Sequence, residues 1–330
     1  MHRARDARRR RLDQVAALLV RGAGYISVLV LVGIFLLLGV RAGQTFGGGI
    51  ETQPLTEAER AALDPEIVAA LVDRPEPPSP AHFFGGREWR PDAYRTSSYG
   101  ILALLAATLL TTAGAMAIAI PIGLIAAAWP TFVAQGRLRD GMKYGIELVA
   151  AVPSVVIGFL GLQLIGPALG RAFDRPGGLS ALNGSILLAV MALPTIISLS
   201  EDAFRAVPRA MIDGSLALGG DRWQTLVHVA IPAARSGLFA AAMLGMGRAI
   251  GETMTVLMAT GNVAQIPTSW LDPVQTMTAT IAIELGEVAR GTTHYFALFA
   301  VGLLLFLVTL GINLAADAVQ RRQERLLRGS

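Results

Sequence analysis

The chain has 330 residues, of which 53% are hydrophobic and only 16% are charged. In soluble domains about a quarter of all residues are charged. This composition therefore excludes a soluble protein and indicates an integral membrane protein. There is no cysteine, which excludes disulfides, thiolate metal sites and cysteine nucleophiles. The four histidines lack the spacing of metal ligands, and we therefore expect no metal site and no cofactor.

Six apolar runs are long enough to cross a bilayer, which takes about 20 apolar residues per helix. They cover residues 22–40, 99–128, 144–169, 182–199, 231–260 and 295–316. The first run follows a basic start but is longer than the apolar core of a signal peptide, so we interpret it as an uncleaved anchor. The pattern predicts an all-α integral membrane protein with six transmembrane helices.

Basic residues predict the orientation of these helices. With both termini in the cytoplasm, 18 of the 28 lysine and arginine residues lie on the cytoplasmic side, as the positive-inside rule requires. The chain then divides into a basic tail (1–21), an anchor (22–40), a periplasmic insert (41–98), a core (99–316) and a second basic tail (317–330). We expect the tails to lie beside anionic membrane lipid and not to bind nucleic acid.

The insert at residues 41–98 is acidic and has one local signal. Thr56 and Glu59 have the spacing of a capping box, which predicts a short helix over residues 57–72. A cluster of prolines from residue 75 to residue 80 then ends that helix. We expect a small insert on the periplasmic side.

No catalytic motif is visible in the sequence. The only lysine, Lys143, does not follow a glycine-rich phosphate loop. There is no Gly-x-Ser-x-Gly elbow either. We expect no enzymatic activity in the chain itself.

Residues 200–232 form a cytoplasmic segment between two spans and have helical signals of their own. A helix, a glycine break and a second helix entering the membrane would present a short helix to a cytoplasmic partner. An ordinary connecting hairpin is the alternative.

The spacing within this segment resembles the EAA motif of ABC importer permeases. The Glu, Ala, Ala, Gly and Pro positions of that motif are taken here by Asp213, Gly214, Ser215, Gly219 and Pro232. The resemblance implies a coupling helix that docks in a groove of a separate ATPase. Its contact candidates are Arg205, Asp213, Leu216 and Leu218.

Further segments resemble the membrane subunits of the Pst phosphate importer, at residues 147–148, 152–159, 193–195, 200–203, 222–225 and 247–253. Residues 158–162 and 294–299 are more similar to the PstC type of subunit than to the PstA type. The resemblance implies the type I (MetI-like) permease fold, the bacterial inner membrane and phosphate as substrate. The partners that it implies are a second, PstA-like permease subunit, an ABC ATPase dimer and a periplasmic phosphate-binding protein.

Two charged residues, Arg248 and Glu252, lie within the fifth apolar run. Charges inside a membrane are costly and usually functional. Because the two are four residues apart, they share one helix face and can pair. One interpretation is an ion pair that only orients the helix. The other is that Arg248 attracts a crossing anion, since its planar guanidinium suits phosphate oxygens, while Glu252 holds Arg248 or accepts a proton of phosphate.

Three more residues complete the predicted substrate pathway: Thr253, Ser154 and Glu147. Pro153 predicts an interruption of the third span that frees main-chain groups beside Ser154, either to line a cavity or as a packing kink. Glu147 near the start of that span either faces the cytoplasmic interface or has a gating or pairing role.

Two other functions remain open. A permease for another oxyanion, such as molybdate or sulfate, would use the same coupling segment. An ion-coupled secondary transporter or an integral membrane enzyme would need no ATPase. The EAA spacing and the lack of a catalytic set favour an ABC importer over this second class.

Overall fold

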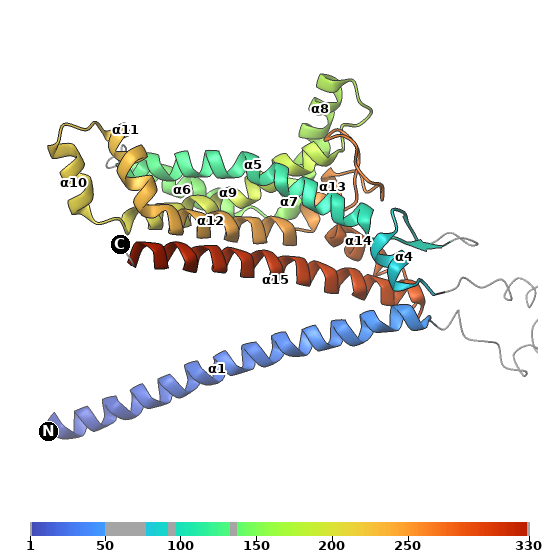
Figure 1. The fold of residues 1–330 in the computed structure, drawn as a ribbon, viewed down its shortest axis with the longest axis horizontal. Coiled ribbons are helices and arrows are strands. Elements are labelled where there is room, and N and C mark those ends of the chain that lie inside the picture. Colours follow the sequence, from blue (N-terminus) through green and yellow to red (C-terminus); the bar gives the residue numbers. More distant parts are fainter. Residues whose placement is uncertain (1, 50–76, 92–96, 133–136, 329–330) are drawn as a thin grey trace, which may run out of the picture.

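The computed structural model describes residues 2–49, 77–91, 97–132 and 137–328, which are mostly helical (Figure 1). Six helices in this part of the chain are long and apolar enough to cross a membrane: Ala17–Gly47, Leu102–Phe132, Ser154–Phe173, Ala181–Arg205, Arg222–Gly251 and Thr293–Ala318. Each overlaps one of the predicted runs, so the prediction of an all-α protein with six spans is confirmed. The helix predicted over residues 57–72 lies outside the described residues.

The centre of the bundle is α5 (Leu102–Phe132) packed on α9 (Ala181–Arg205), with α12 (Ile231–Gly251) on another side of α9. Small residues allow these helices to approach closely, as is usual in membranes. The side chain of Ile196 fills the space left by two glycines. A Cβ added to Gly123 or Gly245 would lie only 2.7 or 2.5 Å from a carbon of Ile196.

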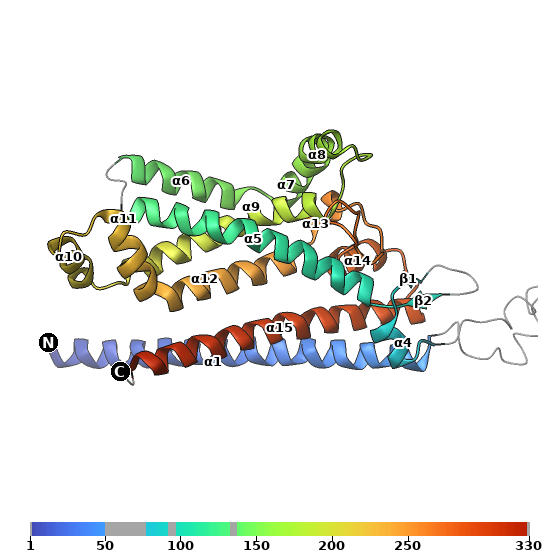
Figure 2. The ribbon, with the colours of Figure 1, turned by 45° about the horizontal axis from the view of Figure 1, so that its top comes forward.

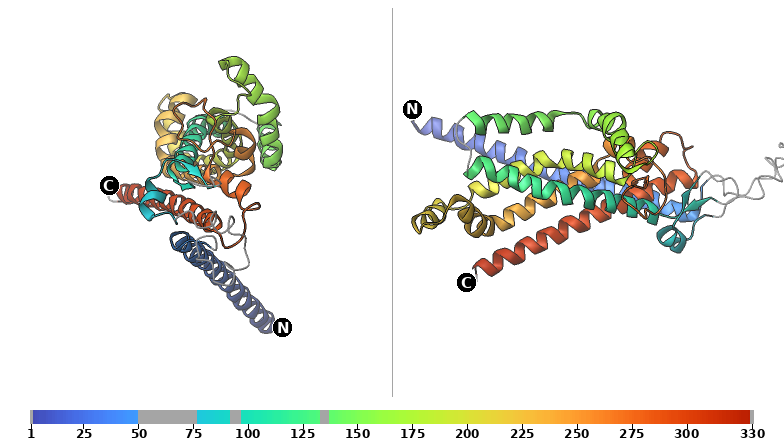
Figure 3. Two further views of the ribbon diagram at one scale, coloured as in Figure 1. Left: turned by 90° about the vertical axis from the view of Figure 1, so that its right-hand side faces the viewer. Right: turned by 90° about the horizontal axis from the view of Figure 1, so that it is seen from above.

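Two long helices lie outside this centre, α1 (His2–Gln44), which ends in the 3-10 turn Thr45–Gly47, and α15 (Thr293–Arg328). They meet where the rings of Phe35 and Phe306 lie 5.5 Å apart. Toward its N-terminal end α1 diverges from the other helices (Figures 1 and 3). The apolar side chains on its middle are exposed in this single chain, which suits a surface that faces lipid or another membrane helix.

The predicted run at residues 144–169 is not one continuous helix. It includes part of α6 (Arg137–Ala151), and the span itself, Ser154–Phe173, consists of α7 (Ser154–Leu160), a π-helical segment (Gly161–Ile165) and α8 (Gly166–Phe173). Pro153 has an extended conformation (φ −60°, ψ 139°). Helix α6 ends before it because the proline ring clashes with the preceding helical turn and the residue has no amide hydrogen. The predicted interruption at Pro153 is confirmed, and α6 is a helix separate from the span that follows.

A small cap lies at the end of the bundle opposite the chain termini, beside the ends of α1 and α15 (Figure 2). It contains α4 (Pro80–Gly85) and the antiparallel strands β1 (Trp89–Arg90) and β2 (Ser98–Tyr99). We call these three elements the periplasmic cap, after the side on which the sequence predicts this segment. Beside it lie α14 (Met277–Glu284) and the start of α15. The buried side chains that join them include Phe83, Trp89, Tyr99, Met277 and Leu298.

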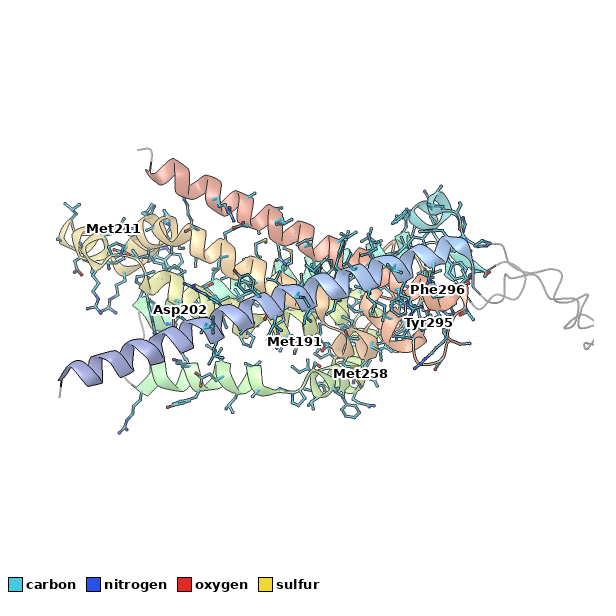
Figure 4. All side chains as sticks on the ribbon, turned by 90° about the horizontal axis from the view of Figure 1, so that it is seen from below. Met191, Asp202, Met211, Met258, Tyr295 and Phe296 are labelled. Atoms are coloured by element: carbon cyan, nitrogen blue, oxygen red, sulfur yellow. The ribbon has the colours of Figure 1, made fainter. Side chains whose placement is uncertain are left out.

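The other end of the bundle carries two short helices, α10 (Arg209–Ala217) and α11 (Arg222–Thr225). From α11 a π-helical segment (Leu226–Ala230) leads directly into α12. In Figure 1 α10 and α11 lie toward the same end as both chain termini. Figure 4 shows Met211 of α10 and the pair Tyr295 and Phe296 of α15 toward opposite ends of the molecule.

Candidate functional site

The fifth predicted span is interrupted near its end. Helix α12 ends at Gly251, Glu252 has an extended conformation (φ −70°, ψ 132°), and α13 (Met254–Ala259) begins shortly after. The prediction of one helix over residues 231–260 is therefore wrong. The hydroxyl of Thr278, at the start of α14, donates to the main-chain carbonyl of Glu252 at 2.9 Å. This hydrogen bond satisfies an acceptor that a continuous helix would have used itself.

A second helix break lies beside the first. The hydroxyl of Thr255 on α13 is 3.2 Å from the carbonyl oxygen of Ser154, the first residue of α7. The same hydroxyl is 3.4 Å from Oε1 of Glu252. The structure thus brings together Ser154, Glu252 and the intervening Thr253, three of the predicted pathway residues. Irregular main chain inside a membrane is tolerated where protein or a polar cavity surrounds it.

Arg248 lies in the last turn of α12, and its side chain is exposed in this single chain. The described residues contain no ion pair between Arg248 and Glu252, so the pairing that their spacing allows is not formed in this structure. The physical reason is that the main chain leaves the helix at Glu252. Among the described residues the guanidinium of Arg248 has no carboxylate partner, and it lies one turn before a helix break. It is therefore better placed to bind an anion than to orient the helix through an ion pair.

Glu147 lies elsewhere. Its exposed side chain is on α6, in a groove between α6 and α9 that Lys143, Glu201, Asp202 and Arg205 also line. Arg205, at the end of α9, forms an ion pair with Glu201 one helical turn earlier. The structure therefore places Glu147 with Arg205, apart from the two helix breaks, and places Arg205 outside the short helix α10.

The segment with EAA spacing forms the predicted helix, glycine break and second helix. Helix α10 ends before Gly219, whose positive φ of 88° strongly favours glycine. Asp221 then caps α11 with a full capping box. The hydroxyls of Ser215 and Thr225 lie 3.0 Å apart and join the two helices. The segment is therefore a built helical hairpin and not a loose connection.

The outer surface of this hairpin is apolar and exposed. Leu216 is exposed, and Leu218 is 92% exposed. Asp213 and Gly214 on α10 are also exposed, and so is Pro232 in the first turn of α12. Exposed leucines at the aqueous end of a membrane protein indicate a surface that another protein covers.

A turn between α13 and α14 holds the start of α9. The main-chain carbonyls of Trp270 and Asp272 accept hydrogen bonds from the amides of Leu182 and Ala181 at 2.7 and 3.0 Å. Hydrogen bonds from the hydroxyl and the amide of Thr268 lower the pKa of the Asp272 carboxyl below its ordinary value. The sequence alone gave no signal for this turn.

Comparison with known proteins identifies the family. The family described as "Binding-protein-dependent transport system inner membrane component" matches residues 119–329. The chain belongs to this family. It is accordingly a non-catalytic, multi-pass permease subunit of a bacterial ABC importer, located in the inner membrane.

Several curated relatives are similar over most of the chain. The probable ABC transporter permease protein YqgH of Bacillus subtilis (strain 168) is 32% identical over 301 residues, 91% of this chain and 88% of that protein. The phosphate transport system permease protein PstC of Mesorhizobium japonicum is 34% identical over 246 residues, 69% of this chain and 74% of that protein. The predicted resemblance to PstC-type permeases is confirmed.

Solved structures confirm the fold. A chain of the inward-facing MetNI methionine ABC transporter has a TM-score of 0.52 at 20% identity, over 68% of this chain and 94% of that chain. A chain of a bacterial ABC transporter for import of the acidic polysaccharide alginate has a TM-score of 0.51 at 17% identity, over 67% of this chain and 78% of that chain. Both are ABC importers, so the permease described here has the expected MetI-like fold.

Proposed function

We propose that this permease is the PstC-like membrane subunit of an ATP-driven phosphate importer. The observation that carries the proposal is the meeting of two helix breaks, at Ser154 and at Glu252, one turn beyond the exposed guanidinium of Arg248. Discontinuous helices with an unpaired charge are how transporters build ion and substrate sites. The relatives named as phosphate permeases support phosphate as the transported anion.

In this proposal Arg248 supplies the positive charge that replaces part of the hydration of phosphate. Its planar guanidinium donates two parallel hydrogen bonds to phosphate oxygens. The side-chain hydroxyls of Ser154 and Thr253 offer further donors at the breaks. Each of these contacts contributes little binding free energy, because a transport site must also release its anion.

Glu252 provides selectivity. An ionised carboxylate only accepts hydrogen bonds. Phosphate near neutral pH retains at least one P–OH group, which donates to the carboxylate, whereas sulfate has no proton to donate. Glu252 therefore tolerates phosphate and repels sulfate, and it does so without an ion pair to Arg248.

The partners follow from the hairpin formed by α10 and α11. A groove of one subunit of an ABC ATPase dimer receives the exposed Leu216 and Leu218. ATP-driven closure of that dimer moves α10, and the unbroken path through α11 and α12 carries the movement to Arg248. A second, PstA-like permease subunit supplies the other half of the pathway, a periplasmic phosphate-binding protein delivers the anion, and Glu147 contributes to a cytoplasmic gate.

A second candidate has one observation in its favour. YqgH, a relative that covers most of the chain, is named as a probable ABC transporter permease without any substrate. A permease of the same architecture for molybdate or sulfate is therefore the competing proposal. The anion that competes with phosphate distinguishes the two.

The test is phosphate uptake in cells that lack this chain and other phosphate carriers, complemented by wild type or by variants. Arg248→Gln should abolish most uptake. The matched control Arg235→Gln changes an exposed arginine in the first part of the same helix and should transport normally. Glu252→Gln should let sulfate compete with phosphate. Normal phosphate uptake without the chain would contradict the phosphate proposal, and unchanged selectivity would contradict the role of Glu252.

A further inference from the structure

A largely buried carboxylate, Glu284, joins four segments at the periplasmic end of the bundle. Its two oxygens lie 3.1 Å from the indole nitrogen of Trp89 in β1. Oε1 also accepts a hydrogen bond of 3.1 Å from the amide of Gln275, just before α14. Oε2 lies 2.7 Å from Nε2 of His294 in the first turn of α15. Because a carboxylate only accepts, the nitrogens are the donors.

Aromatic packing encloses this carboxylate. The rings of Trp89 and Tyr99 meet edge to face at 6.0 Å, and each lies 6.4 Å from the ring of His294. The side chains of Glu284 and His294 are only 15% and 12% exposed. Hydrogen bonds to a charged group in such surroundings are strong, and removing the acceptor leaves several buried donors unpaired.

The other end of the same helix holds the break at Glu252. Helix α14 begins with Thr276 as N-cap, and Thr278 donates to the carbonyl of Glu252. The amide of Met277 donates to the hydroxyl of Thr108 on α5 at 3.0 Å. Helix α14 has eight residues, so its two ends are about 12 Å apart. One short, rigid helix therefore connects the periplasmic cap with the main chain of the helix break.

We propose that Glu284 is a positioning residue for the helix break: by holding the C-terminal end of α14 to the periplasmic cap and to α15, it fixes the main chain at Glu252. The importance of this link for transport rests on the proposed function, since it takes the break as the substrate site. The mechanical link does not. A movement of the cap, for example under a partner seated on the periplasmic side, would reach Glu252 through α14.

The absence of cysteine from the chain makes the link directly measurable. A cysteine in place of Gly251, the last residue of α12, has room for its Cβ and reports on the break. A cysteine in place of Gly141 on α6, also with free space, reports on a distant part of the protein. The rate of reaction with a water-soluble maleimide is measured for each in the purified complex in lipid nanodiscs.

Glu284→Gln should change the maleimide reaction rate at the exposed position 251 about fivefold, the factor for a shift of about 1 kcal/mol toward a released conformation of the break, and leave the rate at position 141 unchanged. Glu287→Gln, which changes an exposed acid three residues further on, should change neither rate. If Glu284→Gln does not accumulate in the membrane, His294→Gln, which keeps a side-chain N–H donor, is compared with His294→Ala. Only the alanine variant should then change the maleimide reaction rate at position 251.

Equal rates at position 251 in wild type and in these variants would overturn the proposal. A parallel change at positions 141 and 251 would also overturn it, because that result indicates a general effect on the structure. Uptake gives the second readout: loss of positioning should raise KM for the transported anion while the amount of protein in the membrane stays constant. If this permease transports another anion, the maleimide result is unaffected, so failure of the phosphate proposal and failure of this one are distinguishable.

Discussion

The hydroxyl of Thr255 lies 3.2 Å from the main-chain carbonyl of Ser154 and so joins two helix breaks that are a hundred residues apart in the sequence. The side chain of Thr255 is fully buried. Each break alone would leave main-chain groups without partners inside the membrane, at a high free-energy cost. The hydrogen bond between them reduces that free-energy cost and holds the two breaks next to each other.

Thr255→Val should therefore weaken transport. The substitution keeps the shape and removes the hydroxyl, which costs about 1 kcal/mol in a buried setting and corresponds to about a fivefold effect. We expect the rate of anion uptake to fall by that factor. Thr131→Val is the matched control, since the hydroxyl of Thr131 bonds only within its own helix, to Ala127. Equal uptake by the two variants would contradict the role of the contact.

Leu218→Ser should reduce binding of the ATPase without affecting folding. The side chain is 92% exposed in the single chain, so its loss costs the fold little, whereas burial against a partner is worth about 2 kcal/mol. Co-purification of the ATPase should fall at least about tenfold. Leu285→Ser, which changes an exposed leucine at the end of α14, should leave it unchanged. Full ATPase binding by Leu218→Ser would place the docking surface elsewhere.

The sequence predicted the spans and one of the two helix breaks. Apolar runs of membrane length are a strong signal, and Pro153 marks its break by its own chemistry. The break at Glu252 has no such marker, because neither Gly251 nor Thr253 forbids a helix. It depends on the hydrogen bond from Thr278, a tertiary contact that no local pattern predicts.

The cluster at Glu284 was not predictable for a related reason. Trp89 and Glu284 are 195 residues apart in the sequence, and α14 is far too short to be found as an apolar run. The pairing that the spacing of Arg248 and Glu252 allows is not formed, because it requires a regular helix through both residues and α12 ends at Gly251. Helical spacing is a reliable guide only where the main chain remains helical.

Gly245→Ala should destabilise the bundle. The new Cβ would lie 2.5 Å from a side-chain carbon of Ile196, and such overpacking costs about 1–3 kcal/mol. We expect a Tm several degrees lower in detergent. Gly311→Ala, where a Cβ meets nothing within 4 Å, is the control. In the double variant with Ile196→Ala the two losses should be less than additive. Strict additivity would show that the two residues do not interact.

Asp272→Asn should lower thermal stability near neutral pH and have less effect in acid. The carboxylate accepts hydrogen bonds of 2.8 and 2.9 Å from the hydroxyl and amide of Thr268, which lower its pKa. A carboxyl whose pKa is lower in the folded state contributes stability above its unfolded pKa, about 3.9, and loses it as the pH falls through the folded value. The difference in Tm between wild type and variant should therefore be a few degrees at most, since the group is accessible, and should shrink below about pH 4.

Asp174→Asn, at an exposed aspartate, is the control. A difference for Asp272→Asn that stays constant into acid would show that the charge is not the cause.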